Sequence, residues 1–437
     1  MPNWPPTGTL FRTGPEACPR LVYTYVVHYS EVALKGKNRP EFVRALRRNI
    51  ARALAPNHPN VESRDSRLCV TLDADSAEAA LKLSRVFGIA WFAKADVVDA
   101  DYEKIEEAVL KVARASTAGT FRVDPRRADK TFPINSMELA RRLGSAIARE
   151  TGKWVDLSDP GLTIHADIVR RQALIYAVKT QGPGGLPVGT AGRVMHLFSG
   201  GIDSPVAAWL LLKRGVRPVY LHFYVAPNSE GPIQSKVTSL LKILSAWSGK
   251  STLVMVPFDE YQLATANVPG ELEPSLFRRF MRMTAEHLAP KFRASAVSTG
   301  DSLSQAASQT LWNLGVFDSG ASLPVLRPLL SYDKEEVVGL AKRIGTYELS
   351  LEEYKDCCAI ITRHPRTRAK AAKIAECVEG LGFDNLISRS LESASLVSYS
   401  PRHDEMKIAP LAEVIGQVAG GEASAKAPSP TALPAQG

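Results

Sequence analysis

Six consecutive residues have the composition of an anion-binding loop: Ser199, Gly200, Gly201, Ile202, Asp203 and Ser204. Two adjacent glycines permit a sharp turn whose backbone N–H groups stay open to an anion. The loop joins an apolar segment at 194–198, which predicts a buried strand, to a segment at 205–214, which predicts a helix. Asp203 or Ser204 could cap that helix, and its positive end would face the same anion. The pattern therefore predicts a phosphate site at the carboxyl end of a strand.

The loop differs from the two commoner phosphate-binding loops. A Walker loop requires Lys followed by Ser or Thr after its last glycine, and a dinucleotide-binding loop requires the pattern G-x-G-x-x-G. Neither is present here. A pair of glycines can also simply connect a strand to a helix, but the flanking serines and aspartate favour anion binding.

Alternating predicted strands and helices divide the chain into three folded parts. The first, 21–90, has strands at 21–28 and 68–72 and helices at 41–54 and 76–87. The second, 91–180, has helices at 102–113 and 136–150 and strands at 120–123, 161–168 and 173–178. A Gly- and Pro-rich linker at 181–192 precedes the third part, 193–400. Its five predicted strands indicate a parallel α/β sheet, at 194–198, 218–223, 252–257, 294–299 and 325–328.

Composition restricts the class of protein. The chain has 437 residues, of which 45% are hydrophobic and 23% charged, as in a globular protein. We expect disordered tails at 1–20 and 418–437, no membrane span, and a cytoplasmic location because the N-terminus lacks the features of a signal peptide. Five cysteines without a C-x-x-C pair favour neither a disulfide framework nor a structural zinc site. The net charge of +9 permits a polyanionic partner but also fits a solvated basic surface.

The loop at 199–204 resembles the PP-loop of the ATP pyrophosphatase superfamily, whose members release pyrophosphate and leave AMP on a carbonyl oxygen. Six further segments are similar to the tRNA 4-thiouridine synthetase family, and the match extends from Val22 to Ile387 in unbroken order. These segments lie at 31–39, 85–89, 182–189, 300–310, 326–329 and 354–358. Two departures are Asp301 and Ser304, where the family usually has Glu and Gly.

The resemblance implies a fold and a reaction. The fold would be α/β, with an N-terminal ferredoxin-like module, a THUMP module and a parallel-sheet PP-loop ATP pyrophosphatase domain. Uridine 8 of tRNA would be adenylated at O4, and sulfur would then replace the oxygen to give 4-thiouridine. Because AMP leaves far more readily than a carbonyl oxygen, adenylation splits one difficult step into two easier ones.

The resemblance also implies an ATP site. Of the adjacent Arg278 and Arg279, we favour Arg279, because a helix points the two side chains in different directions. Asp203 could help to place Mg²⁺, although helix capping explains it equally well. Lys334 matches a functional lysine of the family that could steady charge on the phosphates, although a solvated lysine at a helix start is the simpler alternative. The predicted ATP contacts are Leu197, Phe198, Ser199, Gly200, Gly201, Asp203, Ser204, His222, Phe223, Arg279, Gly300 and Gln309.

Cys358 matches the cysteine that the family uses in sulfur transfer, and Cys357 is a second candidate. Nearby Lys355, Arg363 and His364 favour a thiolate, whereas Asp356 opposes it. Nothing after Ile387 resembles the rhodanese-like domain of longer family members. We therefore expect a separate cysteine desulfurase as the sulfur donor. An iron–sulfur cluster on Cys357, Cys358 and Cys377 is the less favoured alternative, because the usual ligand spacing is lacking.

For tRNA, six basic side chains could meet the acceptor-stem backbone through its A-form shape and phosphates: Lys35, Lys37, Arg39, Arg126, Arg127 and Lys130. Each could equally be a solvated surface charge. Homodimerisation is a further expectation from the family. Two alternative functions are a PP-loop ligase or amidotransferase acting on a small molecule and a non-catalytic RNA-binding protein. The first leaves the N-terminal half unexplained, and the intact loop at 199–204 argues against the second.

Overall fold

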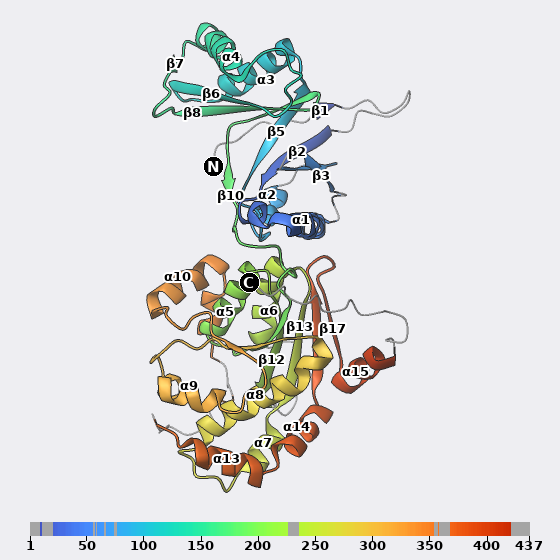
Figure 1. Ribbon diagram of the computed structural model, residues 1–437, viewed down its shortest axis with the longest axis vertical. Helices are drawn as coiled ribbons and strands as arrows, with labels where there is room; N and C mark the ends of the chain where they lie inside the picture. Colours follow the sequence, from blue (N-terminus) through green and yellow to red (C-terminus); the bar gives the residue numbers. More distant parts are fainter. Residues whose placement is uncertain are drawn as a thin grey trace, which may run out of the picture. The chain divides into compact units, whose positions relative to one another are not determined.

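The computed structural model describes residues 9–10, 21–55, 57, 59–64, 67–73, 77–225, 236–353, 357 and 368–420 (Figure 1). The chain divides into two compact units. The first contains residues 1–191 with two short pieces, 212–216 and 246–249, and the second contains the rest. Within the described ranges, no helix combines the length and the apolar character needed to cross a bilayer.

The first unit is built on one ten-stranded sheet whose main path runs β3-β4-β2-β5-β9-β8-β6-β7. Strand β5 (Trp91–Asp99) connects its two halves. Residues 91–95 of β5 pair with β2 (Leu21–His28), and residues 96–99 pair with β9 (Gln172–Tyr176). The two predicted N-terminal modules therefore share a continuous sheet, with β5 belonging to both.

The first half of this sheet is covered by α1 (Arg39–Leu54) and α2 (Ala77–Leu83). Leu46, Ile50 and Leu54 recur at helical spacing along α1 and are fully buried against the strands, as the apolar periodicity predicts. The hairpin partner of β4 (Arg67–Leu72) is β3 (Asn60–Arg64), which the sequence does not predict. Only one residue of β3 is buried, so its apolar signal is weak.

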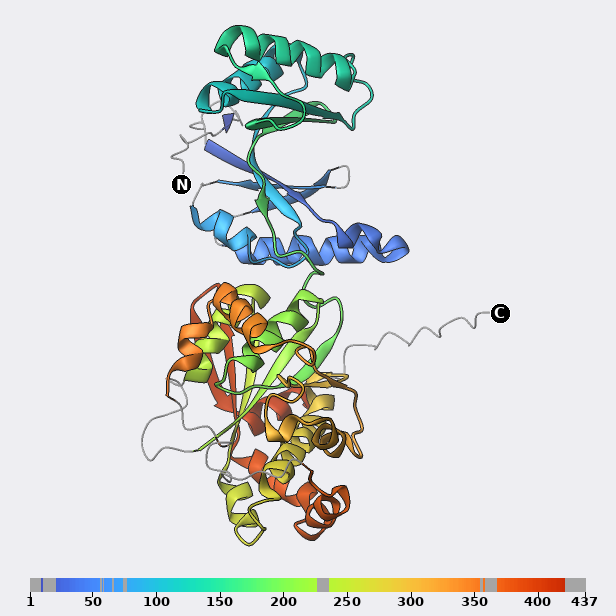
Figure 2. The ribbon, with the colours of Figure 1, turned by 90° about the vertical axis from the view of Figure 1, so that its left-hand side faces the viewer.

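In the second half, α3 (Tyr102–Ala115) and α4 (Ser136–Thr151) lie over one face of the strands (Figure 2). Side chains of Asp101 and Asn135 cap these helices by accepting backbone N–H bonds, and Gly152 ends α4 in the left-handed conformation with φ 67°. The remaining strands of the unit are β6 (Thr120–Arg127), β7 (Trp154–Val155), β8 (Leu162–Val169) and β10 (Thr180–Gln181), with β1 (Thr9–Leu10) paired to β2.

The second unit has a seven-stranded sheet in the order β15-β14-β11-β12-β13-β16-β17. Its five predicted strands pair in parallel: β11 (Arg193–Leu197), β12 (Arg217–Tyr224), β13 (Ser251–Pro257), β14 (Val297–Ser298) and β15 (Val325–Leu326). An antiparallel hairpin, β16 (Ser395–Ser400) and β17 (Glu405–Pro410), completes the sheet. The unit thus continues past residue 400, where we expected it to end, and α15 (Leu411–Gly420) extends into the predicted tail.

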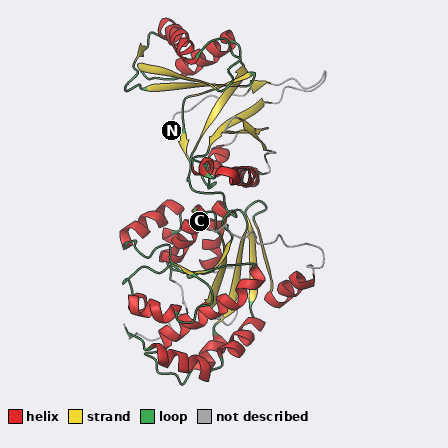
Figure 3. Cartoon of the chain, viewed as in Figure 1, coloured by secondary structure: helices red, strands yellow, loops and turns green. Residues whose placement is uncertain are grey.

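Helices flank the strands of the second unit (Figure 3). Val219, Leu221 and Phe223 of β12 pack into a cluster with Phe277 and Phe280 of α8, while the alternate residues of β12 are also buried. Both faces of the central strands are therefore covered, as expected for a parallel sheet. The helices of this unit are α5 (Asp203–Lys213), α6 (Lys236–Ser248), α7 (Asp259–Thr265), α8 (Glu273–Phe292), α9 (Leu311–Asp318), α10 (Lys334–Ile344), α11 (Tyr347–Leu351), α13 (Ala371–Gly380) and α14 (Phe383–Glu392).

Candidate nucleotide-binding site

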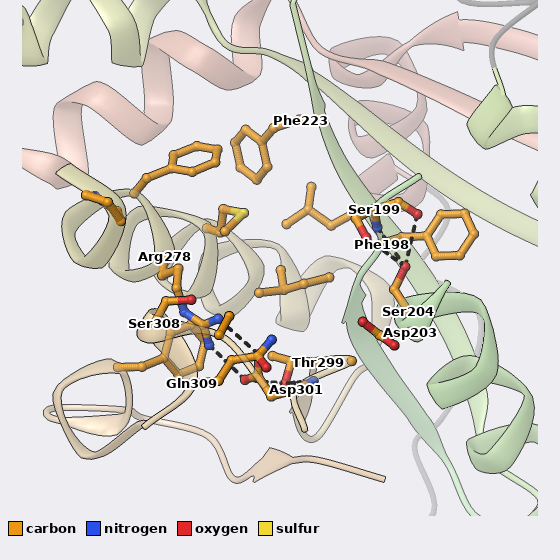
Figure 4. A pocket seen from close by; sticks show the side chains of 18 of the residues that line it. Phe198, Ser199, Asp203, Ser204, Phe223, Arg278, Thr299, Asp301, Ser308 and Gln309 are labelled. Atoms are coloured by element: carbon orange, nitrogen blue, oxygen red, sulfur yellow. Dashed lines mark hydrogen bonds and ion pairs between the residues drawn. The ribbon is translucent and has the colours of Figure 1, made fainter. Parts of the chain in front are cut away.

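Two serines close the loop between β11 and α5. The backbone N–H of Ser199 donates to Oγ of Ser204 at 2.9 Å, and that hydroxyl donates back to the carbonyl of Ser199 at 3.0 Å (Figure 4). The loop is therefore held as a ring at the carboxyl end of a central strand. Such a position, followed by a helix, is where α/β sheets bind phosphates.

Gly300 lets a second segment approach this loop. A Cβ atom at Gly300 would lie 2.8 Å from the backbone N of Ser204, closer than side chains tolerate. The segment after β14 can therefore pack against the start of α5 only with glycine at this position. This packing explains why glycine is needed at position 300, whereas its contact with ATP stays a prediction.

Two buried histidines hold the backbone around the loop. Nε2 of His196 donates to the carbonyl of Ser204 at 2.9 Å, so its Nδ1 accepts from the Ser298 hydroxyl at 2.8 Å. Burial lowers the pKa of His196 to about 4, which keeps the ring neutral. His222 contacts the carbonyl of Phe198 through Nδ1 at 2.8 Å. Sequence reasoning missed His196, because a single histidine in an apolar strand does not reveal its partners.

A pocket of about 340 Å³ opens beside the loop, within the size range of small-molecule sites. Its wall includes nine of the predicted ATP contacts: Leu197, Phe198, Ser199, Asp203, Ser204, His222, Phe223, Gly300 and Gln309. The apolar part of the wall also contains Leu221, Pro274, Phe277 and Met281. Gly200 and Gly201 belong to the adjacent loop but not to this wall, and neither has a positive φ. The pocket thus combines an apolar wall, suited to an aromatic base, with a polar loop, suited to phosphates.

The structure brings Arg278, not the predicted Arg279, into this pocket. Arg279 points toward the C-terminal end of α9, where it donates to the carbonyl of Phe317 at 3.5 Å and lies against Gly320, two residues beyond the helix. The two side chains diverge as expected for neighbours on a helix, and the pocket wall contains the one that was not favoured. Which of the two faces the pocket depends on the rotation of α8 about its axis, which one sequence does not fix.

Arg278 belongs to a chain of charges along the pocket wall. Asp301 accepts two bonds from Arg278 and a third, at 3.3 Å, from Nε of Arg327, which also pairs with Asp318. Burial alone would raise the pKa of Asp301, but the charge and hydrogen bonds of Arg278, with help from Arg327, hold it below its ordinary value. The motif at 326–329, which had no assigned role, thus supplies an arginine to this network.

Asp203 faces two other side chains near the loop. Its Oδ1 lies 3.0 Å from Nζ of Lys334, and its Oδ2 accepts from the amide of Gln305 at 3.1 Å. Lys334 is the first residue of α10, whose N-cap Asp333 forms a capping box with Glu336. The predicted pair Asp203 and Lys334, far apart in sequence, is therefore brought into contact. Gln305 was not predicted as a site residue, although it lies in the segment at 300–310 that is similar to the family.

Of the two predicted cysteines, the structure describes only Cys357. Cys357 has none of its surface exposed and lies in the main hydrophobic cluster of the second unit. Cys358 falls outside the described residues. A fully buried thiol has no access to a substrate, so the burial of Cys357 favours its neighbour as the reactive residue. Cys377, on α13, is partly buried.

The predicted RNA-binding residues divide into exposed and engaged side chains. Lys37 and Lys130 are exposed, and Arg126 is exposed beside Asp124 at 3.5 Å. Lys35 contacts Glu31 at 3.9 Å. Two others have local structural partners: Arg39 donates to the Tyr29 hydroxyl at 3.2 Å, and Arg127 donates to the carbonyl of Phe132 at 2.8 Å.

A parallel α/β sheet with a serine-closed, glycine-containing loop at its carboxyl edge defines a nucleotide-binding domain of the PP-loop type. Three family models match the chain in order: the ThiI ferredoxin-like domain at 24–93, the THUMP domain at 99–178 and the thiamine biosynthesis protein ThiI at 189–383. These matches confirm the predicted fold class and the order of the three parts.

Relatives match nearly over their full lengths. A probable tRNA sulfurtransferase from Moorella thermoacetica is 38% identical over 87% of this chain and 98% of its own length. Another probable tRNA sulfurtransferase, from Caldanaerobacter subterraneus subsp. tengcongensis, is 39% identical over 83% of this chain and 96% of its own length. A crystal structure of a 4-thiouridine synthetase–RNA complex with bound ATP matches with a TM-score of 0.80 and 33% identity, covering 86% of this chain and 99% of that one. The chain belongs to the ThiI family of tRNA sulfurtransferases.

Proposed function

We propose that this protein is an ATP-dependent tRNA sulfurtransferase that adenylates uridine 8 at O4 and replaces the oxygen with persulfide-derived sulfur, giving 4-thiouridine. The observation that carries the proposal is the closed loop at 199–204 beside a nucleotide-sized pocket, in a chain of the ThiI family. The related 4-thiouridine synthetase structure contains both RNA and ATP, two of the substrates that this reaction requires.

ATP would occupy the pocket with its adenine on the apolar wall and its phosphates at the loop. The proposed contacts are Leu197, Phe198, Ser199, Gly200, Gly201, Asp203, Ser204, His222, Phe223, Gly300 and Gln309, with Arg278 in place of Arg279. Lys334 would stabilise the negative charge that develops on the departing pyrophosphate.

Mg²⁺ normally accompanies ATP and binds through one or two carboxylates together with phosphates. Asp203 fits this role, because its carboxylate lies at the loop. Among the described residues, its oxygens contact the Lys334 amine and the Gln305 amide, neither of which is an arginine that would hold both oxygens. Asp301 fits less well, because two arginines already engage its oxygens. We therefore assign Asp203 as the residue that would hold the ion.

The reaction would proceed in two steps. O4 of the uridine attacks the α-phosphorus and pyrophosphate leaves, which makes O4 part of a good leaving group. The outer sulfur of a Cys358 persulfide, supplied by a separate cysteine desulfurase, would then attack C4, and AMP departs with the former O4. A second thiol, from the desulfurase or an external thiol reductant, would attack the Cys358 sulfur, so that the S–S bond breaks, 4-thiouridine is released and Cys358 is left in a disulfide that is reduced before the next turnover. An iron–sulfur cluster on Cys357, Cys358 and Cys377 is the less favoured alternative, because the usual ligand spacing is lacking.

The first unit would bind the tRNA. Lys37, Arg126 and Lys130 are exposed and would contact phosphates, together with Lys35, which lies two residues before Lys37. Arg39 and Arg127 would act mainly by fixing local structure. We further propose a cytoplasmic location, where tRNA and ATP occur together, and homodimerisation as the assembly state.

A single-turnover assay tests the proposed function. The protein is mixed with radiolabelled ATP and unmodified tRNA, and pyrophosphate, free AMP and tRNA-bound AMP are measured with and without the tRNA. Release that depends on tRNA, and that is lost when uridine 8 is replaced by cytidine, supports the proposal. AMP formation that is indifferent to tRNA would instead favour the small-molecule ligase. Absence of ATP turnover would favour a non-catalytic RNA-binding protein.

A further inference from the structure

The described wall of the nucleotide pocket has more carboxylate than guanidinium or ammonium groups. It contains two aspartates, Asp203 and Asp301, and a single arginine, Arg278. ATP carries several negative charges, so this set of side chains alone would repel it. Cations that contact the two carboxylates from outside the wall are therefore needed. Lys334 is such a cation for Asp203, at 3.0 Å.

Arg327 is the corresponding cation for Asp301. It directly follows β15, and the pairing of β15 with β14 brings it close to the residues that follow β14. Its Nε donates to Oδ2 of Asp301 at 3.3 Å. The side chains are only 10% and 5% exposed, respectively, so water and salt screen their interaction much less than that of a surface ion pair.

Asp301 is shared between two arginines. Arg278 donates two hydrogen bonds to its oxygens, at 3.0 and 2.8 Å, and Arg327 donates one. One carboxylate cannot neutralise two guanidinium groups, so these three residues together keep one positive charge. The other partner of Arg327 is Asp318, which lies outside the described wall and is 41% exposed, so that solvent screens its charge.

An aromatic ring of the pocket wall packs against both arginines. The guanidinium carbon of Arg278 lies 4.9 Å from the centroid of the Phe317 ring, and that of Arg327 lies 5.5 Å from it. Planar guanidinium groups combine such ring contacts with directed hydrogen bonds to carboxylates. The ring and Asp301 together thus fix the positions of both positive charges.

We propose that Arg327 is a positioning residue for ATP that acts through Asp301: by sharing this carboxylate, it leaves Arg278 with net positive charge toward the phosphates. Without Arg327, Asp301 would neutralise Arg278, and the wall would lose its attraction for an anion. The arginine of the motif at 326–329 would thus raise the affinity for ATP without touching the nucleotide. The inference rests on the proposed function, because it takes ATP as the occupant of the pocket.

The test compares charge with geometry in the full-length protein. Arg327→Gln removes the charge, whereas Arg327→Lys keeps the charge and loses the planar fork. Asp318→Asn removes the outer negative charge but keeps an acceptor oxygen for Arg327. Arg343→Gln is the matched control, because this exposed guanidinium lies 5.8 Å from the Trp209 ring centroid and outside the described pocket wall. Isothermal titration with ATP at several salt concentrations gives the affinities, and melting curves show whether each variant is folded.

We expect Arg327→Gln to weaken ATP binding about tenfold, the effect of removing one charge from a partly buried ionic network. The dependence of its ATP affinity on salt should also fall, because less charge attracts the nucleotide. Arg327→Lys should stay within about threefold of wild type, because the charge is retained. Asp318→Asn should bind ATP at least as tightly as wild type. The control should stay within about twofold, as is usual for surface changes.

Unchanged ATP affinity in a folded Arg327→Gln protein would overturn the inference. Weakening of about tenfold in Arg327→Lys, or a clear loss of affinity in Asp318→Asn, would also overturn it, because Arg327 would then act through its shape and not its charge. These two variants decide the question if Arg327→Gln does not fold. Failure of the proposed function would look different, because it would appear in the wild-type protein, as ATP turnover indifferent to tRNA or as no binding of ATP.

Discussion

Arg278 and Asp301 are joined by two parallel hydrogen bonds, Nη1 to Oδ1 at 3.0 Å and Nη2 to Oδ2 at 2.8 Å. This pairing holds a guanidinium at the wall of the nucleotide pocket, where Figure 4 shows both residues opposite Asp203 and Ser204. A bidentate arginine–carboxylate pair is geometrically specific, so it fixes the direction of the guanidinium as well as its position. We therefore expect Arg278, rather than Arg279, to contact ATP.

Replacing either member of the Arg278–Arg279 pair with glutamine gives a matched comparison. Arg278→Gln should weaken ATP binding about tenfold to a hundredfold, because a hydrogen bond to a charged group contributes about 1.5–3 kcal/mol. Arg279→Gln should leave the ATP dissociation constant nearly unchanged, although it can lower thermal stability through the lost contact with Phe317. Isothermal titration with ATP measures both. The reverse ranking would show that Arg279 is the ligand after all.

The two adjacent cysteines should respond differently to serine. Cys358→Ser should abolish desulfurase-driven thiolation of tRNA, because a hydroxyl cannot carry a persulfide. Cys357→Ser should retain it with reduced stability, because this side chain is buried in the core. Quantifying 4-thiouridine by mass spectrometry, with a melting curve for each variant, measures both effects. Thiolation by Cys358→Ser together with inactivity of a folded Cys357→Ser protein would reverse the assignment.

His196 should make stability sensitive to acid. Its pKa is about 4 in the folded protein, against an ordinary value of 6.5, so the unfolded chain binds a proton that the folded protein does not. Protonation of His196 in the unfolded chain therefore lowers the free energy of unfolding as the pH falls from 6.5 toward 4, by on the order of 3 kcal/mol in total, and has no effect above pH 6.5. His196→Gln should flatten this part of the curve of unfolding free energy against pH. An unchanged slope in the variant would argue against His196 as its source.

Arg126 and Arg127 provide a matched pair for RNA binding. Arg126 is exposed, whereas Arg127 donates to the carbonyl of Phe132. Arg126→Gln should weaken tRNA binding. It should also lower the slope of log affinity against log salt concentration by about one, the value for the loss of one phosphate contact. Arg127→Gln should mainly lower thermal stability. Fluorescence anisotropy with labelled tRNA over a range of salt concentrations distinguishes them, and equal salt slopes for wild type and Arg126→Gln would contradict the assignment.

Local sequence patterns predicted much of the fold and the anion-binding loop, and the family resemblance predicted most of the other pocket residues. The strands β11, β12 and β13 and the loop at 199–204 depend on short-range signals, namely apolar runs ended by glycine and serine. Nine of the predicted nucleotide contacts line one pocket because strands of a parallel sheet present their carboxyl ends at one edge.

The remaining features depend on long-range pairing. Asp301, Arg327 and Asp318 come from separate segments, and only the folded chain reveals that they meet Arg278. The sequence also does not show which face of α8 is turned to the pocket. Arg282 is fully buried, so the helix does not divide simply into an apolar and a polar face. The hairpin of β16 and β17 was missed because its alternating burial is weak.

The most direct test of the central claim uses bulk tRNA from a strain in which the gene for this protein is deleted. Mass spectrometry of digested tRNA measures 4-thiouridine in the parent, the deletion strain and the deletion strain carrying the wild-type gene. We predict that 4-thiouridine is present in the parent, disappears on deletion and returns on complementation. Unchanged 4-thiouridine in the deletion strain would contradict the assignment of this protein as the tRNA sulfurtransferase.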